Sequence, residues 1–253
     1  MRLAFVLTAK QQLPEASQVL AAWRAIVPNE PPLTADPASA GTQNVLGFLL
    51  RSATPVHVAL MPAPVPNREA DEAARFSVGA LGTGWTLPEH NAHLMVVLQN
   101  DSKQKAAEAM RDLTRLAAAV AKASDAVGIY WGDGHATHRP ELVIDLAAEE
   151  LPIMLWTGVS VAFESPTRVS LLSLGMRQLD LPDLLLTAPR RMGNDALGMF
   201  FDLLSYLARR EEPINDGETV GRSEEEHLVV RYVPSPIAEG QLVWRVEVPE
   251  GPN

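Results

Sequence analysis

The order of strand-like and helix-like segments in the first half of the chain constrains the fold more than any other feature. Short apolar runs alternate there with longer segments whose apolar residues recur every three or four positions, as on one face of a helix. The predicted segments are a strand at 3–8, a helix at 14–27, strands at 45–51 and 56–61, a short helix at 68–76, a strand at 93–99 and a helix at 102–123. The first six follow the order β-α-β-β-α-β, which is the ferredoxin-like split pattern with both helices on one face of an antiparallel sheet.

The second half of the chain loosely repeats this order. Its predicted segments are a strand at 127–131, β-rich runs at 152–163 and 168–175, a helix at 193–210, and strands at 227–233 and 241–248. We therefore expect an α+β protein of two ferredoxin-like lobes, residues 1–124 and 125–253, with mainly antiparallel sheets and helices packed on one face. The two lobes are expected to pack as one compact unit.

The charge of the chain bears on its partners. Asp and Glu outnumber Lys and Arg, which gives a formal net charge of −10, and no basic cluster is longer than the pairs at 190–191 and 209–210. A surface that follows phosphates needs concentrated cations, so a nucleic-acid partner is not expected. An acidic surface speeds the encounter with a basic protein. The same charge also serves solubility alone, and both interpretations stay open.

Cysteine is absent from the chain, which excludes disulfides, thiol catalysis and thiolate metal sites. No apolar stretch approaches the roughly 20 residues that span a bilayer. The apolar run at 3–8 is too short for the core of a secretory signal. We therefore expect a cytoplasmic protein without a membrane partner.

Two pairs of histidines, His90 with His93 and His135 with His138, have the spacing H-x-x-H. Imidazole is the commonest metal ligand in proteins, and zinc accepts four nitrogens. However, three-residue spacing aligns two side chains on a helix, and both pairs lie where strands meet loops. Surface or core-capping histidines are the alternative, so no metal or other cofactor is expected, and these four residues are the ligands if a metal binds.

An aromatic pair followed by a glycine turn ends the predicted strand at 127–131. Tyr130 and Trp131 precede Asp133, and Gly132 and Gly134 flank that aspartate. Tyrosine and tryptophan are enriched in the energetic centres of protein interfaces, so these three residues are candidates for contact with a partner. The alternative is that strand alternation buries one of the two aromatic residues in the core.

Acidic residues gather around a loop that follows the last predicted helix. The candidates for an acidic partner-binding surface are Glu211, Glu212, Asp216, Glu218, Glu224 and Glu225. The loop lacks the alternating carboxylates of a calcium site and the Lys-Ser/Thr pair of a phosphate site. A solvated surface is the alternative for these residues. The chain also lacks the G-x-S-x-G element of a hydrolase.

Several ordered blocks of residues resemble a known family. They are 58–66, 90–97, 113–115, 127–131, 152–156, Gly175-Met176 with 181–184, and 216–221. By these blocks, which span about 3–233, the chain is similar to the bacterial domain of unknown function 4261. The resemblance implies a bacterial cytoplasmic protein and carries over no catalytic residue. Relatives beside interbacterial toxin and secretion genes would imply an immunity or accessory role, which is an association with no chemical argument behind it.

These observations favour a non-catalytic protein-binding protein. The resemblance makes it an immunity protein that neutralises an interbacterial toxin of a type VI secretion or polymorphic system, with a basic toxin or effector as partner. One alternative is a metal- or histidine-dependent enzyme that uses the four histidines, because imidazole titrates near neutral pH. Another is an adaptor or chaperone for a secretion effector, which binds its partner without inhibiting it.

Overall fold

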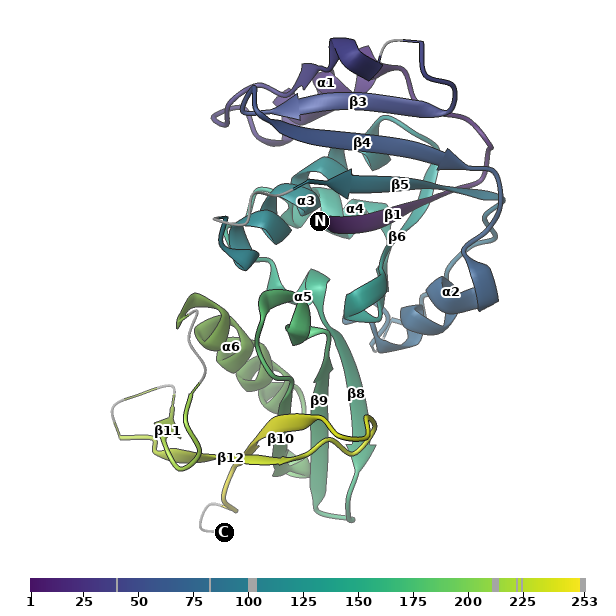
Figure 1. The fold of residues 1–253 in the computed structure, drawn as a ribbon. Helices are drawn as coiled ribbons and strands as arrows, with labels where there is room; N and C mark the ends of the chain where they lie inside the picture. Colours follow the sequence, from purple (N-terminus) through teal and green to yellow (C-terminus); the bar gives the residue numbers. More distant parts are fainter. Residues whose placement is uncertain are drawn as a thin grey trace.

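The computed structural model describes residues 1–39, 41–81, 83–99, 104–210, 214–221, 223 and 225–250. Its helices accompany two separate sheets, both of them mostly antiparallel, which confirms the mixed α+β class. The first sheet lies above the second in Figure 1, and the short helix α5 (Ile153–Trp156) lies between them. No helix in the described ranges has the length and apolar content needed to cross a bilayer.

The first sheet has seven strands in the order β2-β3-β4-β5-β1-β6-β7, and every neighbouring pair is antiparallel. Its strands are β1 (Arg2–Thr8), β2 (Thr34–Ala35), β3 (Val45–Leu50), β4 (Thr54–Met61), β5 (Ala92–Leu98), β6 (Ala126–Trp131) and β7 (Ala136–His138). Alternate residues of β4 and β5, including Val58 and Val96, are fully buried against the helices. The other residues of these strands therefore point to the opposite face.

One face of the first sheet is covered by α1 (Ala16–Ile26), α3 (Ala106–Lys122) and α4 (Pro140–Leu146). The long helix α3 is buried almost all round, because it packs against α1, α4 and the strands. The short α2 (Glu69–Ala73) packs on the β7 side, against Leu7 and Tyr130 of the other face. Six short 3₁₀ turns complete the described elements: η1 (Pro37–Ser39), η2 (Pro66–Arg68), η3 (Ala74–Phe76), η4 (Gly132–Gly134), η5 (Met176–Leu179) and η6 (Arg190–Met192).

The second sheet has six strands in the order β11-β12-β13-β10-β9-β8. Its strands are β8 (Gly158–Phe163), β9 (Arg168–Leu174), β10 (Leu184–Pro189), β11 (Thr219–Val220), β12 (Leu228–Pro234) and β13 (Leu242–Glu247). All neighbours are antiparallel except β10 and β13. The described part of this lobe has one long helix, α6 (Asn194–Arg210), where a split β-α-β-β-α-β unit has two. The expected ferredoxin-like lobes are therefore not confirmed.

The two sheets divide the chain later than the predicted lobes 1–124 and 125–253 do. Strands β6 and β7 belong to the first sheet, and the second sheet begins at β8. The β-rich run predicted at 152–163 starts with α5 and becomes strand only from Gly158. A four-residue apolar run has no helical period to read, so the sequence does not distinguish such a turn from a strand.

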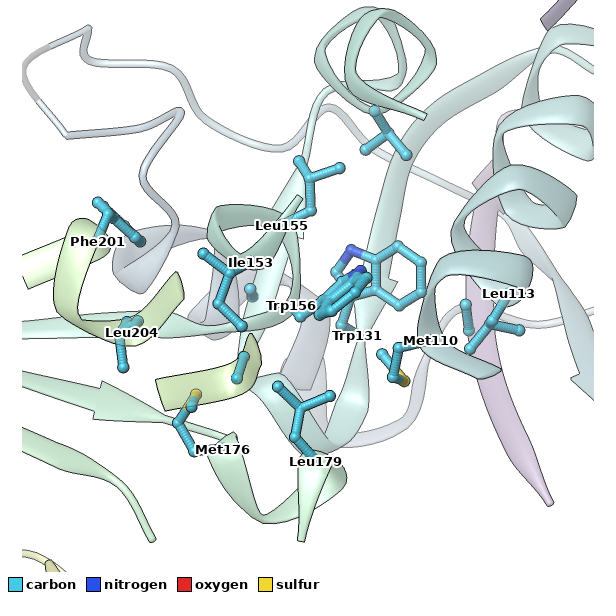
Figure 2. Packing of buried hydrophobic residues seen from close by; sticks show 14 of the residues in the cluster. Met110, Leu113, Trp131, Ile153, Leu155, Trp156, Met176, Leu179, Phe201 and Leu204 are labelled. Carbon is cyan, nitrogen blue, oxygen red and sulfur yellow. The ribbon is translucent and has the colours of Figure 1, made fainter. Parts of the chain in front are cut away.

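A continuous hydrophobic core joins the two lobes (Figure 2). Trp131 of β6 and Trp156 of α5 lie together in this core, with Met110 of α3 and Leu179 of η5 nearby. The Trp156 Nε1–H donates to Oγ1 of Thr114 at 2.7 Å, so its buried polar atom is satisfied. Buried residues from both halves of the chain therefore belong to one hydrophobic cluster.

Candidate functional site

The first histidine pair is bound to backbone. The Val65 N–H donates to Nε2 of His90 at 3.4 Å, and Nδ1 of His93 lies 2.8 Å from the carbonyl oxygen of Ala63. Burial lowers the pKa of His93; the hydrogen bond to Ala63 opposes this and His90 adds to it. Both side chains are mostly buried beside the loop that follows β4.

The second histidine pair is divided between the surface and the core. His135 is exposed and has a left-handed backbone, with φ of 45°. His138 is buried, and its Nε2 lies 3.2 Å from the carbonyl oxygen of Leu155. Burial lowers the pKa of His138 to about 4. In the part of the chain that the structure describes, no three His, Cys, Asp or Glu side chains are grouped to hold a metal.

The predicted aromatic pair is buried on both faces of β6. Trp131 is 1% exposed and packs in the core beneath α3, whereas Tyr130 is 4% exposed and faces the other side. The Tyr130 ring stacks on Phe5 with 5.5 Å between centroids. Neither aromatic side chain forms an exposed edge, although Asp133, in the turn that follows, is exposed. Alternation buried both residues because this sheet is covered on both sides at β6.

The predicted acidic surface is only partly described. Glu211, Glu212 and Glu224 lie outside the described residues, and Glu225 is exposed. Asp216 accepts hydrogen bonds from the Tyr232 N–H at 2.8 Å and from Arg231 at 3.3 Å.

Glu218 makes similar local contacts. Its carboxylate accepts bonds from the side chain and backbone of Asn215, which lower its pKa, and Arg210 lies 4.0 Å away. Asp216 thus holds the loop against β12, whereas Glu218 fixes the loop on itself, and each lies beside an arginine.

The open face of the first sheet carries a cluster that the sequence analysis did not identify. We call Phe5, Ala59, Met61 and Met95 the Phe5 patch. Phe5 pairs with Met95 across the strands, and Met95 pairs with Ala59, so the three share the face turned away from α3. Met61 is 42% exposed, and the other three are partly exposed. The continuous apolar run at 3–7 was the available signal, because a strand that is apolar at consecutive positions has apolar side chains on both faces.

Two carboxylates interact with Tyr130, whose ring stacks on Phe5. The Tyr130 hydroxyl, next to Phe5, interacts with Glu69 and Asp133. Burial, followed by these two negative charges, raises the pKa of Tyr130 to about 12, so the phenol stays protonated at neutral pH. His93 packs edge-on against Phe5 with centroids 5.6 Å apart. The apolar patch therefore lies next to a tyrosine that interacts with two carboxylates.

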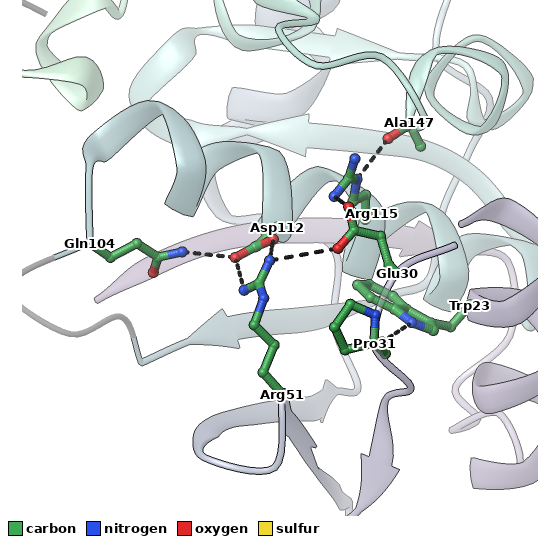
Figure 3. A network of polar contacts seen from close by, with 8 residues as sticks. All are labelled: Trp23, Glu30, Pro31, Arg51, Gln104, Asp112, Arg115 and Ala147. Atoms are coloured by element: carbon green, nitrogen blue, oxygen red, sulfur yellow. Dashed lines mark hydrogen bonds and ion pairs between the residues drawn. The ribbon is translucent and has the colours of Figure 1, made fainter. Parts of the chain in front are cut away.

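A second group of polar residues lies beside the core (Figure 3). Asp112 of α3 is fully buried and accepts two hydrogen bonds from Arg51, at 2.7 and 2.9 Å, and one from Gln104 at 2.8 Å. Arg115 donates to Glu30 at 2.8 Å and to the Ala147 carbonyl at 3.3 Å. These bonds join the β3–β4 turn, α3 and the loop after α1, which indicates a structural role.

The junction of the lobes depends on a close approach of two turns. Gly175 has φ of 108°, and a Cβ placed there would lie 2.4 Å from Cα of Gly134 and 2.6 Å from the carbonyl oxygen of Asp133. Asp183 accepts bonds from Ser173 and the Met176 N–H, and burial raises its pKa. Only glycine at 175 permits both the conformation and the contact.

Comparison with known proteins gives one family match, which lies within the second lobe. The model of a domain of unknown function, DUF4261, matches residues 172–247, from the last part of β9 to the end of β13. Neither the curated proteins nor the solved structures yield a match. The match is shorter than the span of the resembling blocks, and it covers those at 175–184 and 216–221. The match over residues 172–247 supports the DUF4261 assignment that the sequence resemblance indicated.

Proposed function

We propose that this protein acts by binding another protein and that its Phe5 patch contacts the partner. The observation that carries the proposal is a partly exposed apolar sheet face, on which Phe5 stacks against Tyr130, the residue that interacts with Glu69 and Asp133. Its biological role, by family resemblance, is that of an immunity protein against an interbacterial toxin. A type VI secretion or polymorphic toxin is the partner that this role implies.

The chemistry of the patch suits an apolar surface that carries Lys or Arg. Methionine adapts its shape to irregular partners, and an exposed aromatic edge gives large contact area at low entropic cost. A cation placed beside Tyr130 would meet Glu69 and Asp133 and could lie close to the Phe5 ring. Truncation of a hot-spot side chain at the centre of such an interface costs about 2 kcal/mol or more.

The net charge of the chain supports a basic partner. A charge of −10 on 253 residues accelerates the approach of a positively charged protein, and salt weakens that effect. The histidine-dependent alternative has less support, because His93 and His138 each direct a ring nitrogen at a backbone carbonyl.

A pull-down experiment tests the proposal. The purified protein is immobilised and then exposed to a lysate of the bacterium that encodes it. We expect a specific protein to be retained at about 50 mM salt and less of it at about 500 mM. The Phe5→Ala variant and the double variant Glu69→Gln/Asp133→Asn should each fail to retain this protein. The matched control is Glu149→Gln/Glu150→Gln, an equal charge change at exposed residues that follow α4. Equal retention by all variants, or no retained protein at either salt, would contradict the proposal.

Co-expression with a toxin encoded beside the gene separates immunity from an adaptor role. An immunity protein should restore growth of the host, and the Phe5→Ala variant should not. Binding to the toxin without restored growth would favour the adaptor or chaperone alternative.

A further inference from the structure

One sheet edge of the molecule lacks the protection that the other three have. The edge strands β2, β7 and β11 are two, three and two residues long, whereas β8 is six residues long. Beyond β2 the edge of β3 is covered by η1, and the loop at 216–220 bonds along β12. Proteins commonly shorten, charge or cover an exposed edge, because its free N–H and C=O groups pair with other chains.

Strand β8 also lacks charge and proline. Its sequence is Gly-Val-Ser-Val-Ala-Phe, and its outer side has no strand partner within the described ranges. Val161 is 42% exposed and Phe163 is 64% exposed, on the face where Arg190 lies 4.3 Å from the Phe163 ring centre. The edge is visible at the outer side of the second sheet in Figure 1.

We infer that β8 pairs antiparallel with β8 of a second copy of this chain, about a two-fold axis at Ala162. This register sets Val161 of each copy opposite Phe163 of the other, so each exposed apolar side chain gains an apolar partner. It also sets Ser160 opposite Glu164, where a hydroxyl can donate to a carboxylate. No like charges stand opposite each other along the strand, although each copy carries a net charge of −10.

The register also agrees with what surrounds the strand. The N-terminal end of β8 packs against the first lobe. A Cβ added to Gly158 would lie 2.6 Å from the His135 carbonyl oxygen and 3.2 Å from Cβ of Phe76. The second half of the strand is exposed at 161–163. An axis at Ala162 uses that exposed half. The two six-stranded sheets would then form one continuous sheet across the dimer.

A single introduced cysteine tests this arrangement without interference, because the chain has none of its own. In the proposed dimer the two Ala162 side chains face each other with Cβ atoms roughly 5 Å apart. Ala162→Cys should form a covalent dimer under mild oxidation or with a short bismaleimide cross-linker. The control, Ile237→Cys, lies in the exposed β12–β13 loop and should cross-link far more slowly.

Sedimentation velocity of the unmodified chain supplies the second measurement. We expect a monomer–dimer equilibrium, with the dimer dissociation constant raised at least about tenfold by Phe163→Lys and unchanged by Ile237→Lys. Both residues are exposed, and circular dichroism confirms folding. A monomer throughout the micromolar range, or equal cross-linking of both cysteine variants, would overturn the inference. Loss of the dimer by Ile237→Lys but not by Phe163→Lys would do the same. These outcomes are independent of whether the Phe5 patch binds a partner.

Discussion

Asp112 of α3 and Asp216 of the loop before β11 make nearly the same contacts in different surroundings. Each accepts a hydrogen bond from an arginine and at least one more from a second group. The Asp112 side chain is 0% exposed, whereas the Asp216 side chain is 55% exposed. Desolvation makes a charge dependent on its partners, so the same residue type holds the fold together in one place and only shapes a loop in the other.

The strongest test of this comparison removes the buried carboxylate. Asp112→Ala removes the carboxylate that binds the Arg51 guanidinium and the Gln104 amide, leaves Arg51 only the longer 3.9 Å contact with Glu30, and leaves a cavity beside α3. Breaking a buried pair by removing one partner costs about 3–5 kcal/mol. We expect that loss in the free energy of unfolding from urea titration. Asp112→Asn keeps the volume and separates the charge effect from the cavity. A loss below about 1 kcal/mol would show that burial of this pair does not matter.

A buried histidine extends the comparison to pH. The folded pKa of His138 is about 4, below the ordinary value of 6.5. The unfolded chain therefore binds a proton on this residue from about pH 6.5 downward, while the folded chain resists until about pH 4. As the pH falls from about 6.5 to about 4, this histidine should therefore lower the free energy of unfolding by about 3 kcal/mol. Below about pH 4 it should add no further loss.

The measurement is the free energy of unfolding at several pH values between 7 and 4. His138→Gln should lose less stability over that window than the unmodified chain. The exposed His227→Gln variant controls for the loss of a histidine as such. If His138→Gln and the unmodified chain decline in parallel, His138 is not the source of the acid sensitivity.

Two glycines give a third pair of buried and exposed positions. Gly175 and Gly217 both have positive φ, 108° and 90°. A Cβ at 175 would meet backbone of Gly134, whereas one at 217 would lie 3.2 Å from the end of the flexible Arg231 side chain. Alanine strains the backbone at both positions, but only at 175 must the two turns move apart. We expect Gly175→Ala to cost about 1–3 kcal/mol more than Gly217→Ala, measured by urea unfolding. Equal losses of stability in the two variants would mean that the turns at Gly134 and Gly175 can move apart at little cost.

These pairs also show which parts of the molecule could be predicted from sequence. The helices predicted at 14–27, 102–123 and 193–210 and the hairpin at 45–61 were found with small shifts, because their periodic patterns are local and repeat over many residues. The helix α5 was missed because four apolar residues carry no period.

The candidate sites were harder to predict because they depend on long-range packing. Asp112 and Arg51 are 61 residues apart, and nothing near either one signals that they meet. The Phe5 patch needs a strand order that brings 5, 59 and 95 together. Amino-acid composition does not distinguish Asp216 from Asp112, because it carries no information on which side chains are buried.

The smallest expected effect belongs to the exposed loop. Asp216→Ala removes an ion pair to Arg231 and a bond to the Tyr232 N–H, but water can replace both at this exposed position. Exposed pairs contribute about 1 kcal/mol or less, so Asp216→Ala should change the free energy of unfolding by no more than that. The residual effect should shrink further when salt rises from about 0.05 M to about 0.5 M, because the Debye length falls. The Asp112→Ala loss should keep most of its size, since buried pairs are screened much less. Similar salt dependence for the two variants would mean that water reaches Asp112, and burial would then not explain the difference between the two aspartates.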